Sequence, residues 1–217
     1  MDRTIRVNGV GKLSLKPDQI ILPITLEARD ADYQRAVDMG AGQLDAVRSA
    51  VGSAGFLRDR LKTLNFSVSP EFDSVQDEKG RYQRVFKGYL CSHQLKLEFE
   101  LNMPLLSTTF AALAQCPANP EFSVQFTVKD KDAVNDELLR LAAKNARAKA
   151  GILAEASGVR LGELISVDYS WGELRLVSAT TYDSGRNQML SKRAMDIDVE
   201  PDDIVVNDTV NFVWSME

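Results

Sequence analysis

Apolar and polar residues alternate over two stretches near the N-terminus, which predicts two β-strands. The first stretch covers residues 5–15 and the second covers residues 20–28. Lys16, Pro17 and Asp18 lie between them, and proline and aspartate favour turns. We therefore expect the two strands to form a hairpin.

The apolar period then changes to 3.6 residues over residues 33–51, which predicts a helix with one apolar stripe. Either Asp30 or Asp32 can cap its N-terminus, and Gly55 is suited to its C-terminal end. We expect this stripe to pack on a sheet.

Alternation returns in residues 64–72 and again in residues 85–101, separated by a polar segment with Gly80 at a position suited to a turn. These strands predict a long hairpin over residues 61–101. Its second strand has a polar face and an apolar face, and the apolar face contains Tyr89, Cys91, His93, Leu95, Leu97, Phe99 and Leu101.

That second strand is long for a domain of this size. Its 17 residues would span roughly 55 Å at about 3.3 Å per residue. The strand must therefore bend, or its far end must leave the domain and pair elsewhere.

The second half of the chain shows the same kinds of pattern. Residues 105–115 and 132–157 predict helices, and the second of these is rich in alanine. Its apolar arc covers about two-thirds of its circumference, so we expect it to be covered on more than one side. Arg140, Lys144 and Arg147 form its exposed ridge. Strands are predicted over residues 122–128, 165–171 and 204–214.

The order strand, helix, strand, strand occurs twice, which predicts an α+β fold with two sheet-plus-helix lobes. The sheets would be antiparallel or mixed, with helices on one face. We place the lobes at residues 1–104 and 105–217, and a single continuous domain over residues 3–217 stays open.

Residues 173–200 show neither period over most of their length, and long irregular segments are often functional. We expect this segment or the hairpin tip to contact partners, through Asp77, Lys79, Gly80, Tyr82 and Arg186.

The net charge of −5 and the pI near 5.1 argue against nucleic acid as a partner, because binding to phosphates needs a positive field. No apolar run predicts a membrane span or a leader. We expect a cytoplasmic protein, or a periplasmic or surface protein if a leader was removed.

The residues best suited to catalysis or ligand binding are Tyr89, Cys91 and His93, on one face of a strand. They suggest a small-molecule binder or hydrolase with a pocket between the lobes. A buried thiol beside a satisfied histidine is the alternative interpretation. Cys91 and Cys116 could form a redox sensor only if they lie close together.

Metal and phosphate sites have little support. Asp196, Asp198 and Glu200 form an acidic run, but the glycine and glutamate of a calcium loop are missing, so we predict no metal and no cofactor. Gly9, Gly11 and Lys12 lack the spacing of a phosphate loop and are better explained by a close approach of backbone.

Four segments together resemble the SIMPL-domain family, and they cover most of the chain. They are residues 5–30, residues 61–72 with 87–100, residues 142–167, and residues 200–216. The resemblance implies an α+β fold, homo-oligomers, a loose association with oxidative-stress defence or surface antigens in bacteria, and a mammalian relative that associates with a signalling kinase. It implies no catalytic residues. Pro201-Asp202 replaces a frequent Pro-Gly of the family.

We therefore expect a non-enzymatic protein that forms homo-oligomers and acts through protein–protein contacts. The long strand of residues 85–101 offers an edge on which another chain can dock.

Overall fold

The computed structural model describes residues 3–76, 80–170, 172, 174–183 and 200–217. They form an α+β structure with two sheets, as the sequence predicts. The chain divides into two compact units that alternate along the sequence: Met1–Asp18, Thr127–Ala179 and Pro201–Glu217 form one, and Gln19–Phe126 with Thr180–Glu200 form the other. This division does not coincide with a boundary at residues 104 and 105.

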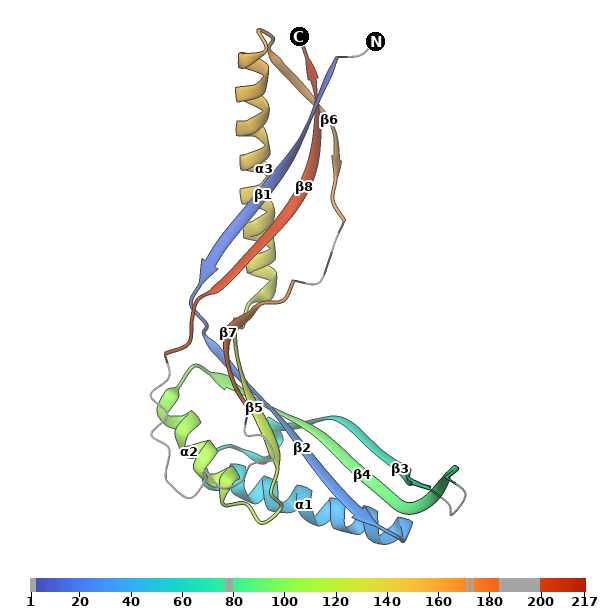
Figure 1. Ribbon diagram of the computed structural model, residues 1–217. Coiled ribbons are helices and arrows are strands. Elements are labelled where there is room, and N and C mark those ends of the chain that lie inside the picture. The colour runs from blue at the N-terminus through green and yellow to red at the C-terminus, as the bar shows by residue number, and fades with distance from the viewer. Residues whose placement is uncertain (1–2, 77–79, 171, 173, 184–199) are drawn as a thin grey trace. The chain divides into compact units, whose positions relative to one another are not determined.

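The second unit contains a five-stranded sheet with the strand order β3-β4-β2-β5-β7 (Figure 1). Its strands are β2 (Gln19–Asp30), β3 (Leu61–Gln76), β4 (Tyr82–Glu100), β5 (Glu121–Thr127) and β7 (Val177–Asp183). The chain order β2-α1-β3-β4-α2-β5 with this spatial order is that of the split βαβ fold.

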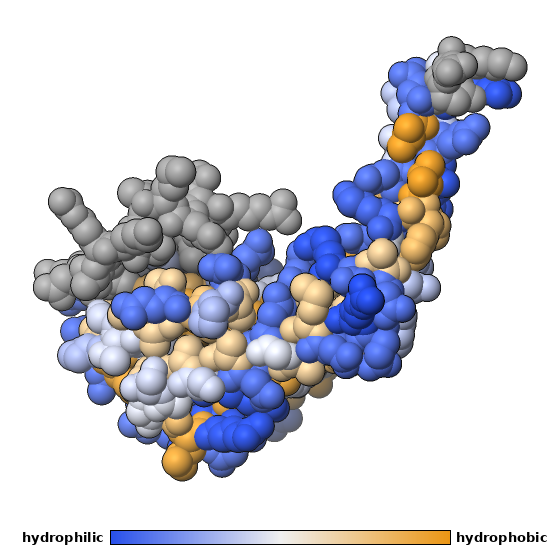
Figure 2. All heavy atoms as spheres, turned by 90° about the horizontal axis from the view of Figure 1, so that it is seen from below, coloured by the Kyte–Doolittle hydropathy of each residue, from blue (hydrophilic) through white to orange (hydrophobic). Residues whose placement is uncertain are grey.

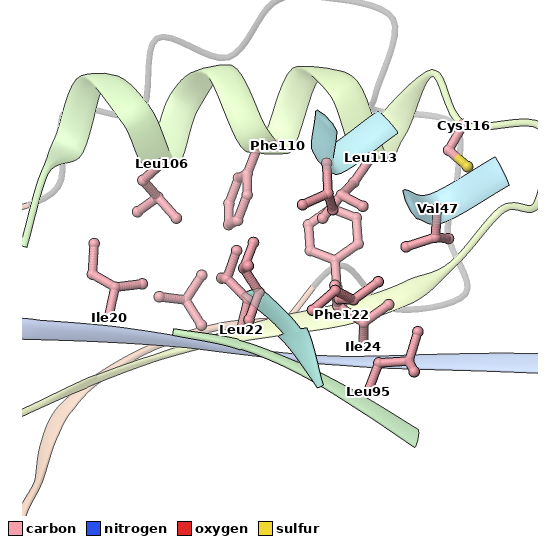
Figure 3. Packing of buried hydrophobic residues seen from close by; sticks show 14 of the residues in the cluster. Ile20, Leu22, Ile24, Val47, Leu95, Leu106, Phe110, Leu113, Cys116 and Phe122 are labelled. Carbon is pink, nitrogen blue, oxygen red and sulfur yellow. The ribbon is translucent and has the colours of Figure 1, made fainter. Parts of the chain in front are cut away.

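Helices α1 (Tyr33–Ser53) and α2 (Met103–Ala114) pack on one face of this sheet, and β2 supplies the centre of the core. Ile20, Leu22 and Ile24 of β2 are at most 1% exposed. Figure 3 shows side chains of α2 pointing toward these β2 residues, with Val47 of α1 beside them. The expected apolar face of β4 is confirmed from Cys91 to Leu97, whereas Leu101 lies beyond the strand and is exposed.

The helix boundaries follow their capping residues. Asp32 caps α1 by accepting a hydrogen bond from the Arg35 amide, and Asn102 caps α2 in the same way. Gly55 follows α1 with φ +100°, a backbone conformation that favours glycine.

The other unit contains a three-stranded sheet with the order β1-β8-β6 and helix α3 (Lys131–Ala156) along it (Figure 1). Its strands are β1 (Thr4–Leu15), β6 (Leu161–Asp168) and β8 (Ile204–Met216). Val7 pairs with Phe212, so the first and last strands of the chain are antiparallel neighbours.

The prediction that residues 5–15 and 20–28 form a hairpin is wrong. β1 pairs with β8 in one sheet, and β2 pairs with β4 in the other. Alternation reveals a strand and its buried face, but it does not reveal the partner. The segment from Lys16 to Asp18 therefore connects two sheets.

Close packing of α3 on β1 explains the strand glycines. A Cβ on Gly9 would lie 2.7 Å from Ala146 Cβ and closer still to the Ala142 carbonyl oxygen. A Cβ on Gly11 would overlap the Leu138 carbonyl oxygen. The expected close approach of backbone is confirmed.

The expectation that α3 is covered on more than one side is wrong for the described residues. Its buried positions recur every four residues from Val134 to Ala154, while Ile152 and Leu153 are 66% and 49% exposed. The small alanine side chains let the sheet approach the helix closely. This close approach explains why α3 is rich in alanine, and no second covering layer is needed. Arg140, Lys144 and Arg147 are exposed, as expected.

Candidate functional site

The most distinctive surface feature is a two-stranded extension of the five-stranded sheet. β2 ends opposite Tyr89, but β3 continues to pair with β4 as far as Gln76 and Tyr82. We call residues 72–76 and 80–88 the arm. The length of β4 is accommodated in the arm, because the far end of β4 extends beyond the neighbouring β2 and pairs with β3 there.

Gly88 marks the base of the arm. The β3–β4 register shifts between Glu71 and Phe72, and Gly88 has φ +149°. A Cβ at Gly88 would lie 2.6 Å from the Asp30 carbonyl oxygen, so only glycine fits where β4 passes the end of β2. A bulge of this kind increases the local twist of a strand pair.

Apolar side chains on the arm are widely exposed. In Figure 2 they lie along the arm as a band of orange and pale-orange spheres. The exposed fractions are 44% for Phe72, 51% for Val75, 75% for Tyr82, 48% for Val85 and 47% for Phe86. An apolar surface of this kind on a protruding element is typical of an interaction site.

A row of aromatic rings connects the arm to the start of α1. Phe72 and Phe86 have ring centroids 5.9 Å apart, Phe86 and Tyr89 are 5.3 Å apart, and Tyr89 and Tyr33 are 5.4 Å apart, all edge to face. The Arg84 guanidinium lies 4.6 Å from the Phe72 ring centroid. Such ring pairs favour a fixed geometry, so the arm is held at its base.

Charges are separated between the two strands of the arm and its base. The β3 strand contributes Glu71 and Asp73, whereas β4 contributes Arg84 and Lys87. Lys87 Nζ lies 3.2 Å from Asp73 Oδ2 in an exposed ion pair. The β3 strand thus carries acidic side chains and the β4 strand basic ones, and Asp73 and Lys87 already pair with each other.

A polar hollow of about 400 Å³ lies where β2 adjoins the start of β5, lined by Thr25, Glu27, Arg29, Asn119 and Glu121. The Arg29 guanidinium binds Glu27 at 2.8 Å and Glu71 at 3.1 Å. These contacts, with Glu27 first, raise the pKa of Arg29. The charges of Arg29 and its neighbours are thus satisfied within the protein.

The structure brings Tyr89, Cys91 and His93 together on the helix-covered face of β4. Cys91 is 1% exposed, and its Sγ would lie 2.6 Å from a Cβ on Gly40 of α1. Burial raises the pKa of the Cys91 thiol, which leaves it in its neutral, weakly nucleophilic form. This environment is that of a packed core thiol.

His93 lies beside the same glycine. Its Nδ1 is buried and has no hydrogen-bond partner among the described residues, and its ring lies tilted against that of Phe66 with a centroid separation of 4.4 Å. Burial, followed by the positive charge of Arg48, lowers the pKa of His93. His93 is therefore neutral in the folded protein at neutral pH.

Both cysteines are free and buried, as expected. They pack in separate clusters, Cys91 with Ala28 and Ala36 and Cys116 in the main core. A redox pair between Cys91 and Cys116 gains no support from this placement.

The remaining predicted contact residues lie in or near the arm tip and the irregular segment. Gly80 and Tyr82 are exposed, and Gln76 Nε2 donates to the Gly80 carbonyl oxygen at 3.0 Å. Asp77, Lys79, Arg186, Asp196 and Asp198 lie outside the described residues, and Glu200 is exposed. Part of the segment 173–200 that showed no period contains the strand β7.

The described residues offer no candidate for a membrane-spanning helix or for a metal site. None of their helices is long and apolar enough to cross a membrane, and their side chains include no group of three or more histidines, cysteines or carboxylates placed to hold a metal.

Sequence reasoning missed the aromatic row and the Arg29–Glu71 contact. The adjacent apolar residues Val85 and Phe86, in an otherwise alternating strand, were a usable signal that both faces of the arm are apolar. The partner of Arg29 lies on a strand 42 residues away and has no local signal.

Comparison with known proteins gives distant relatives. Over 163 residues, the chain is 23% identical to the 26 kDa periplasmic immunogenic proteins of Brucella melitensis biotype 1 and Brucella abortus strain S19. The match covers 75% of this chain and 65% of each relative, so the chain spans less than two-thirds of their length.

The sequence profile of the SIMPL family, described as a protein of unknown function (DUF541), matches residues 5–214. This match extends from β1 to β8 and includes both sheets. It confirms the resemblance drawn from the sequence, and the chain belongs to the SIMPL family.

Proposed function

We propose that this chain is a non-enzymatic protein that associates with copies of itself through the arm. The observation that carries the proposal is the arm itself, a two-stranded extension with exposed apolar side chains and no further strand beside either edge among the described residues. Open strand edges with apolar side chains favour pairing with another chain.

Charge complementarity favours a second copy as the partner. Glu71 and Asp73 lie on the β3 strand, and Arg84 and Lys87 lie on the β4 strand. Asp73 and Lys87 pair within one copy, and they can exchange partners when the β3 edge of one copy meets the β4 edge of another, whereas pairing of two identical edges would bring like charges together.

Substitution of Val85 by aspartate tests this proposal. Val85→Asp places a carboxylate on the apolar surface of the arm, and we expect it to weaken self-association at least tenfold because an unpaired charge is costly to bury. Light scattering over micromolar concentrations measures the mass of the wild-type protein and the variant against the 24.1 kDa of one chain.

Val205→Asp is the matched control, because Val205 is a strand valine that is 77% exposed and lies in the other unit. We expect it to leave the association unchanged. A wild-type protein that stays at the mass of one chain over this range would refute the proposal, as would equal effects of both substitutions.

We also propose a periplasmic location, which is supported by the names of the two Brucella relatives. The cytoplasmic location expected from the sequence gains no support from them. A role in oxidative-stress defence stays a prediction that rests on the family resemblance.

The alternative function, a small-molecule binder or hydrolase at Tyr89, Cys91 and His93, has less support. The Cys91 thiol is buried and packs closely against Gly40. Rapid labelling of Cys91 by a thiol reagent in the native protein, faster than labelling of buried Cys116, would favour this alternative over the proposed one.

A further inference from the structure

The contacts of His93 lie within one unit of the fold and do not depend on self-association. His93 is the only histidine of the chain, and it lies where three elements meet. On β4 it pairs with Leu26 of β2 on one side and with Phe66 of β3 on the other, and Gly40 of α1 lies over it.

The neutral imidazole fits this environment. Nδ1 is buried without a hydrogen-bond partner among the described residues, and a Cβ on Gly40 would lie 3.8 Å from it. A protonated Nδ1 would need an acceptor there, because a buried donor without a partner destabilises the folded state. Leu26, Phe66 and Gly40 offer no side-chain acceptor.

The charged groups nearby reinforce this preference. Arg48 of α1 acts on His93 with its positive charge, and its guanidinium lies 3.4 Å from Asp45 of the same helix. The titratable neighbours on the same face of β4 are Tyr89 and Cys91, and burial raises the pKa of the Cys91 thiol. Among the described residues, the elements packed on His93 thus supply a repelling cation and no carboxylate that forms an ion pair with the ring. Burial, followed by the positive charge of Arg48, lowers the pKa of His93.

We propose that His93 is an acid-sensitive latch that holds helix α1 and edge strand β3 against β4 while it is neutral, and loosens them when it is protonated. The latch acts within one unit of the fold and requires no second copy.

The direction of the pH effect follows from the shift. The pKa of His93 in the folded state lies below its ordinary value of 6.5. Its contribution to stability is therefore complete above about pH 6.5 and is lost as the pH falls from there toward the folded-state pKa. For each pH unit by which folding lowers the pKa of His93, the unfolding equilibrium constant at low pH rises about tenfold.

The first test uses the wild-type protein. Because the chain has one histidine, proton NMR gives one imidazole titration, and we expect its midpoint below 6.5. A midpoint at or above 6.5 would overturn the proposal. Arg48→Gln should move the midpoint upward, because it removes the repelling charge.

The second test separates His93 from the carboxylates that also titrate in acid. Unfolding by urea is measured at pH 7.5 and pH 5 for the wild-type protein and for His93→Gln. We expect the wild-type protein to lose more stability between these two values than the variant. Equal losses would contradict the latch, and the NMR titration decides the matter if His93→Gln does not fold.

Hydrogen exchange locates the effect. At pH 5, after correction for intrinsic rates, amides of β3 beside Phe66 and amides of α1 beside Gly40 should exchange faster relative to pH 7.5. Amides of the β1–β8 pair are the internal control. A uniform change in both sheets would show that His93 is no local latch.

Discussion

Gly9 illustrates how one missing methyl group determines the packing of a whole helix on a sheet. The Ala142 carbonyl oxygen and the Ala146 side chain occupy the space where its Cβ would lie. The helix cannot yield locally, because Ala142 and Ala146 are fully buried in the same cluster. The glycine and the alanines therefore depend on each other.

Replacing Gly9 by alanine should destabilise the protein by about 1–3 kcal/mol, since overpacking of a tight contact with backbone forces the helix outward. Gly42→Ala is the control, because Gly42 lies in helix α1 and a Cβ there meets nothing within 4 Å. That change should stabilise by about 0.5–1 kcal/mol through helix propensity. Urea unfolding measures the free energy of unfolding of both variants. A Gly9→Ala variant as stable as the wild-type protein would contradict the close packing.

At the scale of elements, α3 does more than cover a sheet. Its Asn145 Oδ1 accepts a hydrogen bond from the Val10 amide at 3.0 Å, and its Lys149 Nζ donates to the Asn8 carbonyl oxygen at 3.0 Å. Asn8 and Val10 lie on β1, an edge strand of its sheet. Asn145 and Lys149 thus satisfy backbone groups of that edge, which protects it from pairing with other strands.

We expect Asn145→Leu to cost about 1 kcal/mol, because it leaves the part-buried Val10 amide without its acceptor. Exchange of the Val10 amide with solvent should become faster. Lys144→Gln changes the adjacent exposed position and should stay within about 0.5 kcal/mol of the wild-type protein. Unchanged protection of Val10 in Asn145→Leu would rule out the capping role.

The sequence predicts elements well and their partners poorly, for a physical reason. Periodicity reports which face of a strand or helix is buried, and capping residues such as Asp32 and Asn102 mark where a helix begins. Strand pairing instead depends on contacts between residues far apart in sequence. The pairing of β1 with β8 could not be read from alternation, and turn-forming residues after β1 favoured the wrong neighbour.

The candidate site was predictable only in part. Tyr89, Cys91 and His93 share a face of β4, as a period of two requires, but their burial under α1 depends on Gly40, whose role is visible only in three dimensions. The exposed arm followed from the length of the strand, since a strand longer than its neighbours must extend past them. Its aromatic row joins residues from three elements, so no local pattern could reveal it.

At the scale of the whole molecule, the two compact units divide the chain unevenly. The five-stranded sheet takes four of its strands and both of its helices from one continuous segment, Gln19–Phe126. The three-stranded sheet requires strands from both ends of the chain.

A fragment of residues 19–126 should therefore fold alone, because it retains the main core, including α2 and β5. A fragment of residues 1–104 lacks both of these and should not fold cooperatively. Circular dichroism during urea unfolding distinguishes the two fragments. The opposite result, a cooperative transition for residues 1–104 alone, would favour lobes divided at residue 104.

The antiparallel pairing of β1 with β8 also constrains how the protein is made. Thr4–Leu15 leaves the ribosome before Ile204–Met216, so β1 must wait until β8 has been synthesised before these two strands can pair. Residues 19–126 can fold in that interval. During synthesis, the residues of β1 with their alternating apolar side chains consequently lack β8 as a partner, which exposes them to aggregation and to binding by chaperones.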